Sequence, residues 1–368
     1  MCKMKNKKLI KISIVLANLS AGGAERVLSF IAHELDKDKF ICTLVIIGQK
    51  KDTVYNIDGI ESVYFEKSRV LAGIPQLFWY LLKNKPDIVL SAVAHVNTVT
   101  AYLSILFKKT KFIAREVTIH SIAKTINPTE KSGFEYFAKK RFNYFDKIIC
   151  QSRAMYDDMN AHNEIDQDKF VIINNPISNG FDLRTSGDPS DVLRLVTVGS
   201  FKKVKGHLRL LEALAKLSFD FHYTLIGDGP EKDVIFDLID KLGLSEKITH
   251  IPFTPNVAKY LEINDVFLQG SFTEGFPNAL LECCSIGLPV LAFKAPGGHN
   301  EIIIEGVNGH ILSSEKEFIE KLNTLNQNNY FDPIAVSESV TSRYDKDIII
   351  RKYETLFTEI ISTNQLKQ

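Results

Sequence analysis

At 368 residues the chain is long enough for two domains, because single hydrophobic cores stop growing at about 250–300 residues. Its 45% hydrophobic and 24% charged residues are typical of a globular protein and exclude a disordered or fibrous chain. The first 182 residues hold 26 Lys and Arg against 19 Asp and Glu, a net charge of +7, whereas the remainder carries −6.

The positive charge of the first half suits binding to an anionic surface or to a phosphate-bearing partner. A difference of this size is equally common between domains without any such partner. The five cysteines show no CxxC or CxxH spacing, so we expect reduced thiols and no disulfide or metal framework. The apolar run Leu9–Leu19 is interrupted by polar residues and is too short for a signal peptide or a membrane span. We therefore expect a cytoplasmic protein that is not integral to a membrane.

Short β-rich apolar runs alternate with amphipathic stretches along the chain, which predicts parallel α/β layers. In the first half, a helix is expected at Glu25–Glu34. The strands expected there are Lys11–Leu16, Cys42–Ile47, Ile88–Ser91, Phe112–Ala114, Lys147–Cys150 and Val171–Ile173.

The pattern breaks after Asn174-Asn175-Pro176, where Ser178–Ser190 is rich in turn residues and is interpreted as an interdomain linker. Further strands are expected at Leu193–Val198, Tyr223–Ile226, Ile248–Ile251, Val266–Gln269 and Val290–Ala292. The prediction is therefore a first Rossmann-like domain over 1–182 and a second over 190–340. A terminal helix over 345–368 is expected to pack back on the first domain. Ligands of such sheets bind at the carboxyl ends of the strands, here in a cleft that the two sheets face.

The most informative segment is Glu274–Glu282 (EGFPNALLE), which follows a predicted strand and opens a helix. Pro277 stands at an early helical position, where proline is favoured. The amides of Phe276, Asn278 and Ala279 are expected to point out of the helix start, where a phosphate can bind. Glu274 and Glu282 can then grip the hydroxyl groups of a ribose and a hexose.

On these residues the chain resembles the retaining GT-B glycosyltransferases of family 4, whose E-x7-E element is followed by a G-x-P-V turn, here Gly287–Val290. The resemblance covers nearly the whole chain. Its further motifs are Gly22–Arg26, Asn174–Ile177, Val198–Gly206, Gly227–Glu231, Gly297-Gly298 with Glu301, and Asn308-Gly309.

The resemblance implies a role for each matching residue of the second domain. Glu282 would bind the nucleotide ribose, Glu274 would lie against the donor sugar, and Lys205 would neutralise the diphosphate. Amides of the segment from Gly275 to Ala279 would assist, and a preorganised cation and helix dipole of this kind stabilise the charge of the leaving group. Phe253, in the Ile251–Thr254 segment, would border the base.

One position departs from the family pattern. Where Arg usually follows the glycine aligned with Gly199, this chain has Ser200. Lys202 or Lys203 can replace the charge in part, although lysine lacks the planar fork of arginine.

In the first domain the resemblance places Gly22 and Gly23 in a loop beside the acceptor. His95 follows a strand and is either a cleft residue or a hydrogen-bonded structural histidine. Arg115 and Glu116, opposite charges at a strand end, are expected near the sugar and the acceptor, with His120 as a further candidate.

Metal and dinucleotide chemistry are not expected. The three Asp-x-Asp triplets begin at Asp36, Asp166 and Asp345, in charged connecting segments rather than after buried strands. Neither Gly22-Gly23 nor Gly227-Asp-Gly229 forms the GxGxxG pattern of NAD-binding proteins. We predict no metal and no cofactor, with the nucleotide sugar as a substrate.

Phe134–Phe145 mixes aromatic and basic residues, so it is either a core-facing helix or a helix on an anionic bilayer surface. Basic residues elsewhere in the domain keep the membrane alternative open; they are Lys3, Lys5, Lys7, Lys8, Lys108, Lys109 and Lys111. Members of the family with a similar glycine loop often extend lipid-linked oligosaccharides.

The sequence thus predicts a metal-independent, retaining hexosyltransferase. It would move a hexose or N-acetylhexosamine from a UDP-sugar to a lipid-linked saccharide in surface polysaccharide or glycan assembly, peripherally at the inner membrane face and without a nucleic-acid partner. A nucleotide-sugar epimerase of the same fold is an alternative, as is a non-catalytic partner subunit, although Glu274, Glu282 and Lys205 are all present. A two-lobed sugar-binding protein would need an export signal, which we do not find.

Overall fold

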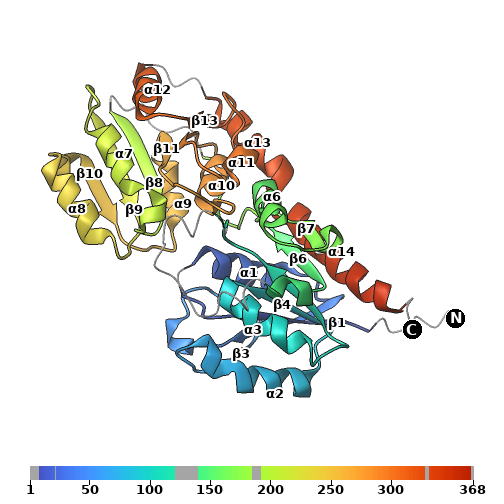
Figure 1. Ribbon diagram of the computed structural model, residues 1–368. Coiled ribbons are helices and arrows are strands. Elements are labelled where there is room, and N and C mark those ends of the chain that lie inside the picture. The colour runs from blue at the N-terminus through green and yellow to red at the C-terminus, as the bar shows by residue number, and fades with distance from the viewer. Residues whose placement is uncertain are drawn as a thin grey trace. The chain divides into compact units, whose positions relative to one another are not determined.

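The computed structural model describes residues 8–20, 22–119, 121, 140–184, 192–327 and 331–365, which form two compact α/β units (Figure 1). Of these residues, the first unit takes those up to Thr118, those from Lys140 to Pro176 and those from Lys346 onward. The second unit takes Ile119, Ser121 and the described residues from Ile177 to Asp345. The predicted fold class, two Rossmann-like domains with parallel sheets, is confirmed.

The first unit is built on a seven-stranded parallel sheet with the order β3-β2-β1-β4-β5-β6-β7. Its strands are β1 (Ile10–Leu16), β2 (Phe40–Ile46), β3 (Glu61–Tyr64), β4 (Ile88–Ala92), β5 (Lys111–Arg115), β6 (Lys147–Cys150) and β7 (Phe170–Ile172). The strand order reverses between β1 and β4, so the loops that follow these two strands diverge at the carboxyl edge of the sheet. Such a divergence leaves room for a ligand.

Helices cover this sheet and close its core. They are α1 (Gly23–Glu34), α2 (Ile74–Asn84), α3 (Ala94–Ser104), α6 (Arg153–His162) and α14 (Lys346–Gln365). The terminal helix α14 belongs to this unit: the ring of Phe357 meets that of Phe40 edge-on at 6.1 Å, and the Glu354 carboxylate accepts a hydrogen bond from the Asp36 amide at 2.9 Å. Helix α14 therefore contributes to the core of the first unit.

The second unit contains a six-stranded parallel sheet with the order β10-β9-β8-β11-β12-β13. Its strands are β8 (Leu193–Val198), β9 (Phe221–Ile226), β10 (Ile248–Ile251), β11 (Val266–Gln269), β12 (Val290–Phe293) and β13 (Gly309–Leu312). Its helices are α7 (His207–Leu214), α8 (Lys232–Lys241), α9 (Val257–Glu262), α10 (Asn278–Ser285), α11 (His299–Ile302), α12 (Glu315–Gln327) and α13 (Pro333–Tyr344). The order reverses between β8 and β11.

Two strands were not predicted. β3 is a short, half-buried edge strand with the sequence ESVY, and β13 begins with Gly309-His310, so neither presents a continuous apolar run. Both lie at a sheet edge and have only four residues, so the apolar pattern that marks the central strands is missing from them. Among the helices that the structure describes, none has the length and apolarity needed to cross a bilayer.

Candidate active site

An ion pair marks the point where the strand order of the second unit reverses. Lys205 ends the loop after β8, Glu274 follows β11, and the Lys205 Nζ lies 2.6 Å from the Glu274 Oε1. The two side chains are 28% and 12% exposed, so the pair is partly shielded from water while the lysine still reaches solvent. Two residues 69 positions apart are thus brought together where open α/β sheets bind their ligands.

Polar neighbours hold the Glu274 carboxylate in this position. Its Oε1 also accepts hydrogen bonds from the Ser271 hydroxyl at 2.6 Å and the Gln269 amide at 3.2 Å, and Gln269 donates to Ser271 at 2.8 Å. Burial alone would raise the pKa of the Glu274 carboxyl, but the Lys205 ammonium and these donors outweigh it and hold the pKa below its ordinary value. Glu274 is therefore an ionised carboxylate at neutral pH. Ser271 and Gln269 were not predicted.

Backbone contacts fix the loop that carries this carboxylate. Arg209, on α7, donates through Nε to the Gly270 carbonyl at 2.5 Å and through Nη2 to the Ser271 carbonyl. On the other side, the Glu274 amide donates to the Pro296 carbonyl at 3.2 Å. Gly297 follows with φ +129°, and a Cβ there would overlap the Glu274 carbonyl oxygen, so only glycine fits. The close packing of the Glu274 loop thus explains why glycine stands at this position of the family-like Gly297-Gly298 pair.

The segment between the two predicted carboxylates is largely buried. Gly275 and Phe276 are buried, and the Phe276 ring packs edge-on against Tyr344 at 5.3 Å, which anchors the loop to α13. Helix α10 begins at Asn278, with Pro277 as its cap residue rather than its first helical residue. Asn278 and Ala279 form the start of this helix, so the predicted helix N-terminus lies directly after the ion-paired Glu274.

Glu282 lies one turn inside α10 and is almost fully buried. The Ser178 hydroxyl lies 3.4 Å from its Oε1. Ser178 precedes the first strand of the unit in sequence, so the start of the second unit packs against the helix that bears the second carboxylate. Its predicted contact with a ribose stays a prediction.

The other predicted donor residues occupy the same carboxyl edge of the sheet. Ser200 follows β8, and its carbonyl oxygen lies 3.2 Å from the Nε2 of His207. Lys202 and Lys203 are exposed beside it, and Phe253 is an exposed side chain after β10. Two exposed lysines therefore lie in the loop that leads to Lys205.

A buried histidine beside Glu274 was missed by sequence reasoning. The ring of His299 is fully buried, and neither of its nitrogens has a hydrogen-bond partner in the described part of the chain. Burial lowers its pKa to about 4, so the imidazole is neutral although the carboxylate of Glu274 acts in the opposite direction. Nothing in the local sequence, GGHNE, distinguishes this side chain from a surface residue.

The predicted residues of the first unit also gather at the carboxyl edge of its sheet. Gly22 is the cap of α1, its amide and carbonyl both pair with the Tyr55 hydroxyl at 2.8 Å, and Gly23 begins the helix. His95 is an exposed residue in the first turn of α3. The preceding Val93 has φ +72°, a strained backbone for a β-branched residue, and such strain often accompanies functional turns.

Arg115 is fully buried at the end of β5. Its Nε donates to the Tyr353 hydroxyl at 3.2 Å, and its Nη2 donates to the Asn175 side chain. Tyr353 belongs to α14 and Asn175 to the end of the first unit's last extended segment. The geometry gives Arg115 a role in joining β5 to α14, and its predicted place near the sugar stays a prediction.

Glu116 is buried in a second polar network. Its Oε1 accepts from the Asn97 amide at 2.8 Å and faces Arg141 at 3.5 Å, and its carbonyl accepts from Gln151 at 2.7 Å. Asn97, Arg141 and Gln151 are buried as well. This network fixes the ends of β5 and β6 and leaves the predicted acceptor contact of Glu116 untested.

Some predictions fall outside the described residues: His120, the part of Phe134–Phe145 before Lys140, and Lys3, Lys5 and Lys7. Of the Asp triplets, Asp36 pairs with Lys39 at 2.7 Å and Asp166 caps a short turn through the Asp168 amide. Within the described ranges no three or more His, Cys, Asp or Glu side chains group as metal ligands.

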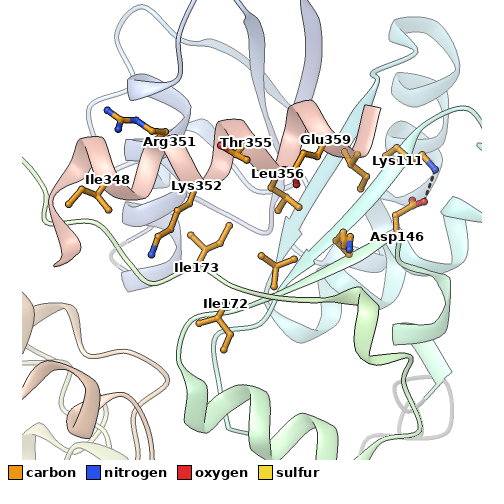
Figure 2. Close-up of a pocket in the computed structure, with 13 residues that line it drawn as sticks. Lys111, Asp146, Ile172, Ile173, Ile348, Arg351, Lys352, Thr355, Leu356 and Glu359 are labelled. Atoms are coloured by element: carbon orange, nitrogen blue, oxygen red, sulfur yellow. Dashed lines mark hydrogen bonds and ion pairs between the residues drawn. The ribbon is translucent and has the colours of Figure 1, made fainter. Parts of the chain in front are cut away.

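A cavity of about 710 Å³ lies elsewhere in the first unit (Figure 2). It runs between α14 and the sheet edge formed by β7, with Ile172 and Ile173 on one side and Leu356 on the other. None of the predicted site residues lines it. It is a seam between the terminal helix and the sheet rather than the predicted site.

Two family models together span most of the chain. Residues 21–179 match the model "Glycosyltransferase Family 4", and residues 181–335 match "Glycosyl transferases group 1". Each match corresponds closely to one predicted domain.

Full-length relatives and solved structures agree with these matches. The chain is 25% identical over 324 residues to a Campylobacter jejuni enzyme named N-acetylgalactosamine-N,N'-diacetylbacillosaminyl-diphospho-undecaprenol 4-alpha-N-acetylgalactosaminyltransferase, covering 83% of this chain and 87% of that one. An uncharacterized glycosyltransferase of Haemophilus influenzae is 24% identical, with 94% and 99% covered. The fold matches that of Anabaena HepE solved with UDP-glucose, with a TM-score of 0.79, 20% identity and coverage of 96% and 100%.

Proposed function

Because the chain belongs to glycosyltransferase family 4, the glycosyl transferases of group 1, we propose that it moves a hexose or N-acetylhexosamine from a nucleotide sugar to a saccharide acceptor with retention of configuration. The observation that carries the proposal is the Lys205–Glu274 pair at the strand-order reversal of the second unit. A cation and an ionised carboxylate side by side suit a ligand with both phosphate and hydroxyl groups.

In the proposed reaction the bond between the sugar C1 and the diphosphate oxygen breaks, and its electron pair stays on the leaving phosphate. The acceptor hydroxyl oxygen forms the new bond to C1 on the same face, and its proton passes to that phosphate oxygen. Lys205 stabilises the charge on the leaving group, a contribution of about 3 kcal/mol for a preorganised donor. The adjacent start of α10 acts in the same direction, so the reaction needs no metal.

Glu274 accepts hydrogen bonds from the donor sugar, which requires that Lys205 turn from the carboxylate toward the phosphate when the donor binds. The Ser271 and Gln269 hydrogen bonds keep the carboxylate in place during this exchange. Glu282 holds the ribose hydroxyl groups from inside α10. UDP is the proposed nucleotide, supported by HepE, whose structure holds UDP-glucose.

The proposed acceptor is a lipid-linked saccharide in surface polysaccharide or glycan assembly. The name of the Campylobacter jejuni relative specifies a diphospho-undecaprenol acceptor, and that relative aligns over 83% of this chain. Gly22, Gly23 and His95, at the carboxyl edge of the first sheet, are the residues we propose for the acceptor side.

A donor screen tests the proposal. Purified protein is incubated with radiolabelled UDP-, GDP- and ADP-sugars and a membrane lipid extract, and label is followed into the organic phase. We expect one donor to label the lipid, and Glu274→Ala and Lys205→Ala to abolish the labelling. Conversion of the free donor without transfer would instead identify an epimerase. Donor binding without any reaction would identify a partner subunit.

A further inference from the structure

Helix α2 presents an apolar face to solvent. Leu77 and Leu81 are buried against the sheet, whereas Pro75, Trp79 and Leu82 follow one another at helical spacing on the opposite side and are exposed. Trp79 is 65% exposed, a large fraction for the biggest apolar side chain of the protein. Figure 1 shows α2 at the periphery of the first unit.

A second apolar segment adjoins this face. Ile105 and Leu106 follow α3, and Leu106 is 66% exposed. The Phe107 ring next to them packs edge-on against Phe78 of α2, with ring centroids 5.5 Å apart. This aromatic contact joins the two segments. We call their exposed apolar side chains, together with Leu71 in the turn before α2, the α2 surface: Leu71, Trp79, Leu82, Ile105 and Leu106.

The charges around the α2 surface are mostly positive, with one carboxylate, Glu61, in the groove that Trp79 and Lys83 also line. Lys83 and Lys85 end α2, Lys108 and Lys109 follow Leu106, and all four are exposed. None of these four lysines has an ion-pair partner among the residues that the structure describes. Neither 67–86 nor 88–115 contains an Asp or Glu. Apolar side chains flanked by these four lysines combine the two attractions that an anionic membrane surface offers.

We propose that the α2 surface docks the protein on an anionic bilayer, with Trp79, Leu82 and Leu106 inserted at the level of the lipid headgroups and the four lysines on the lipid phosphates. Tryptophan is suited to that depth because its ring is apolar and its N–H is polar. A second copy of the chain fits less well, because a self-complementary interface would bring like-charged lysines together.

The purpose of this docking rests on the proposed function, since binding to the bilayer would hold the enzyme where a lipid-linked acceptor lies. Its apolar side chains differ from those of the segment predicted from sequence, Phe134–Phe145, although Lys108 and Lys109 were among the basic residues that the sequence also pointed to. Its test needs neither donor nor acceptor, so failure of docking and failure of sugar transfer are separate results.

Trp79 is the only tryptophan of the chain and reports the contact directly. Its fluorescence is recorded while vesicles of phosphatidylcholine with about a third of phosphatidylglycerol are added, and again with phosphatidylcholine alone. We expect a blue shift and quenching by brominated lipid with the anionic vesicles, both weakened by high salt. No spectral change with anionic vesicles would overturn the proposal, as would an equal change with both vesicle types. A shift that follows protein concentration without vesicles would indicate self-association instead.

Charge-reversal variants locate the surface. Lys108→Glu with Lys109→Glu is expected to lower the vesicle partition coefficient by about tenfold or more, because each lysine at an anionic surface contributes several-fold. Lys50→Glu with Lys51→Glu is the matched control, an adjacent exposed pair of the same unit in a 3-10 turn away from α2. Equal losses for both double variants would show that only net charge matters and would overturn the assignment. Leu106→Ser should reduce the blue shift of Trp79 while the protein keeps its melting temperature.

Discussion

Replacing Lys205 by methionine removes the cation of the ion pair and keeps most of the side-chain stem. The Glu274 carboxylate is 12% exposed and would remain buried with the Ser271 and Gln269 hydrogen bonds but without its counter-charge. Breaking a fully buried pair costs about 3–5 kcal/mol, whereas an exposed pair contributes about 0–1 kcal/mol. With Lys205 at 28% exposure, we expect the free energy of unfolding of the second unit to fall by about 2 kcal/mol at neutral pH. For a unit of this size that lowers the melting temperature by about 4–8 °C.

The loss of stability in Lys205→Met should depend on pH. The folded-state pKa of Glu274 is lowered, so its contribution is present above the unfolded pKa and lost as pH falls through the folded pKa. In Lys205→Met the ammonium is absent, so burial raises the pKa of the Glu274 carboxyl. Folding of the variant then takes up a proton, and its free energy of unfolding recovers as pH falls. The difference between the wild type and the variant is therefore expected to be larger near pH 7.5 than near pH 5.

Urea unfolding followed by circular dichroism measures this difference at both pH values. Trp79 fluorescence serves as an internal control, because the only tryptophan lies in the first unit and should report an unchanged transition. Lys202→Met is the matched variant, since Lys202 is exposed in the same loop. The reasoning is refuted if Lys205→Met is as stable as Lys202→Met, or if the loss is the same at both pH values.

Three further substitutions test other parts of the account. Glu282→Gln should raise the KM for the nucleotide sugar tenfold or more with little change in kcat. An unchanged KM would show that this carboxylate does not bind the ribose. Gly297→Ala should abolish transfer, because the added Cβ overlaps the Glu274 carbonyl oxygen. Its control is Gly306→Ala, which is also at positive φ but has open space around it and should lower the free energy of unfolding by only about 1 kcal/mol. Equal transfer activities of the two variants would contradict this explanation. Tyr353→Phe leaves the buried Arg115 Nε without its acceptor and should lower the free energy of unfolding of the first unit by about 2 kcal/mol. An unchanged urea midpoint would show that this hydrogen bond does not stabilise the unit.

The sequence predicted the fold because its strands are apolar, short and bounded by turn residues. β8 and β11 are nearly continuous hydrophobic runs, as buried parallel strands must be, and both were predicted with the observed bounds. The edge strands β3 and β13 were not predicted because each has only four residues and neither forms a continuous apolar run. The family-like motifs placed Lys205 and Glu274 in one site, and the structure brings them within 2.6 Å.

The supporting groups could not be predicted, because their partners are distant in sequence. Arg209 holds the loop after β11 from a helix 61 residues earlier, and nothing in the helical sequence HLRLLEAL distinguishes it from a surface arginine. The sequence around His299 is that of an ordinary polar residue, whereas the structure buries its ring without a hydrogen-bond partner among the described residues. The hydrogen bond from Arg115 to Tyr353, 238 residues away, could not be predicted either, and the predicted place of Arg115 near the sugar stays a prediction.

The rate of sugar transfer by Lys205→Met is measured beside wild type and Lys241→Met, an exposed lysine at the end of α8, with the donor that labels lipid. The proposed site predicts a fall of about 100-fold or more for Lys205→Met, equivalent to the ~3 kcal/mol expected of one preorganised donor, and a rate within a few-fold of wild type for Lys241→Met. Transfer at the wild-type rate by Lys205→Met would show that the Lys205–Glu274 pair is not where the diphosphate leaves.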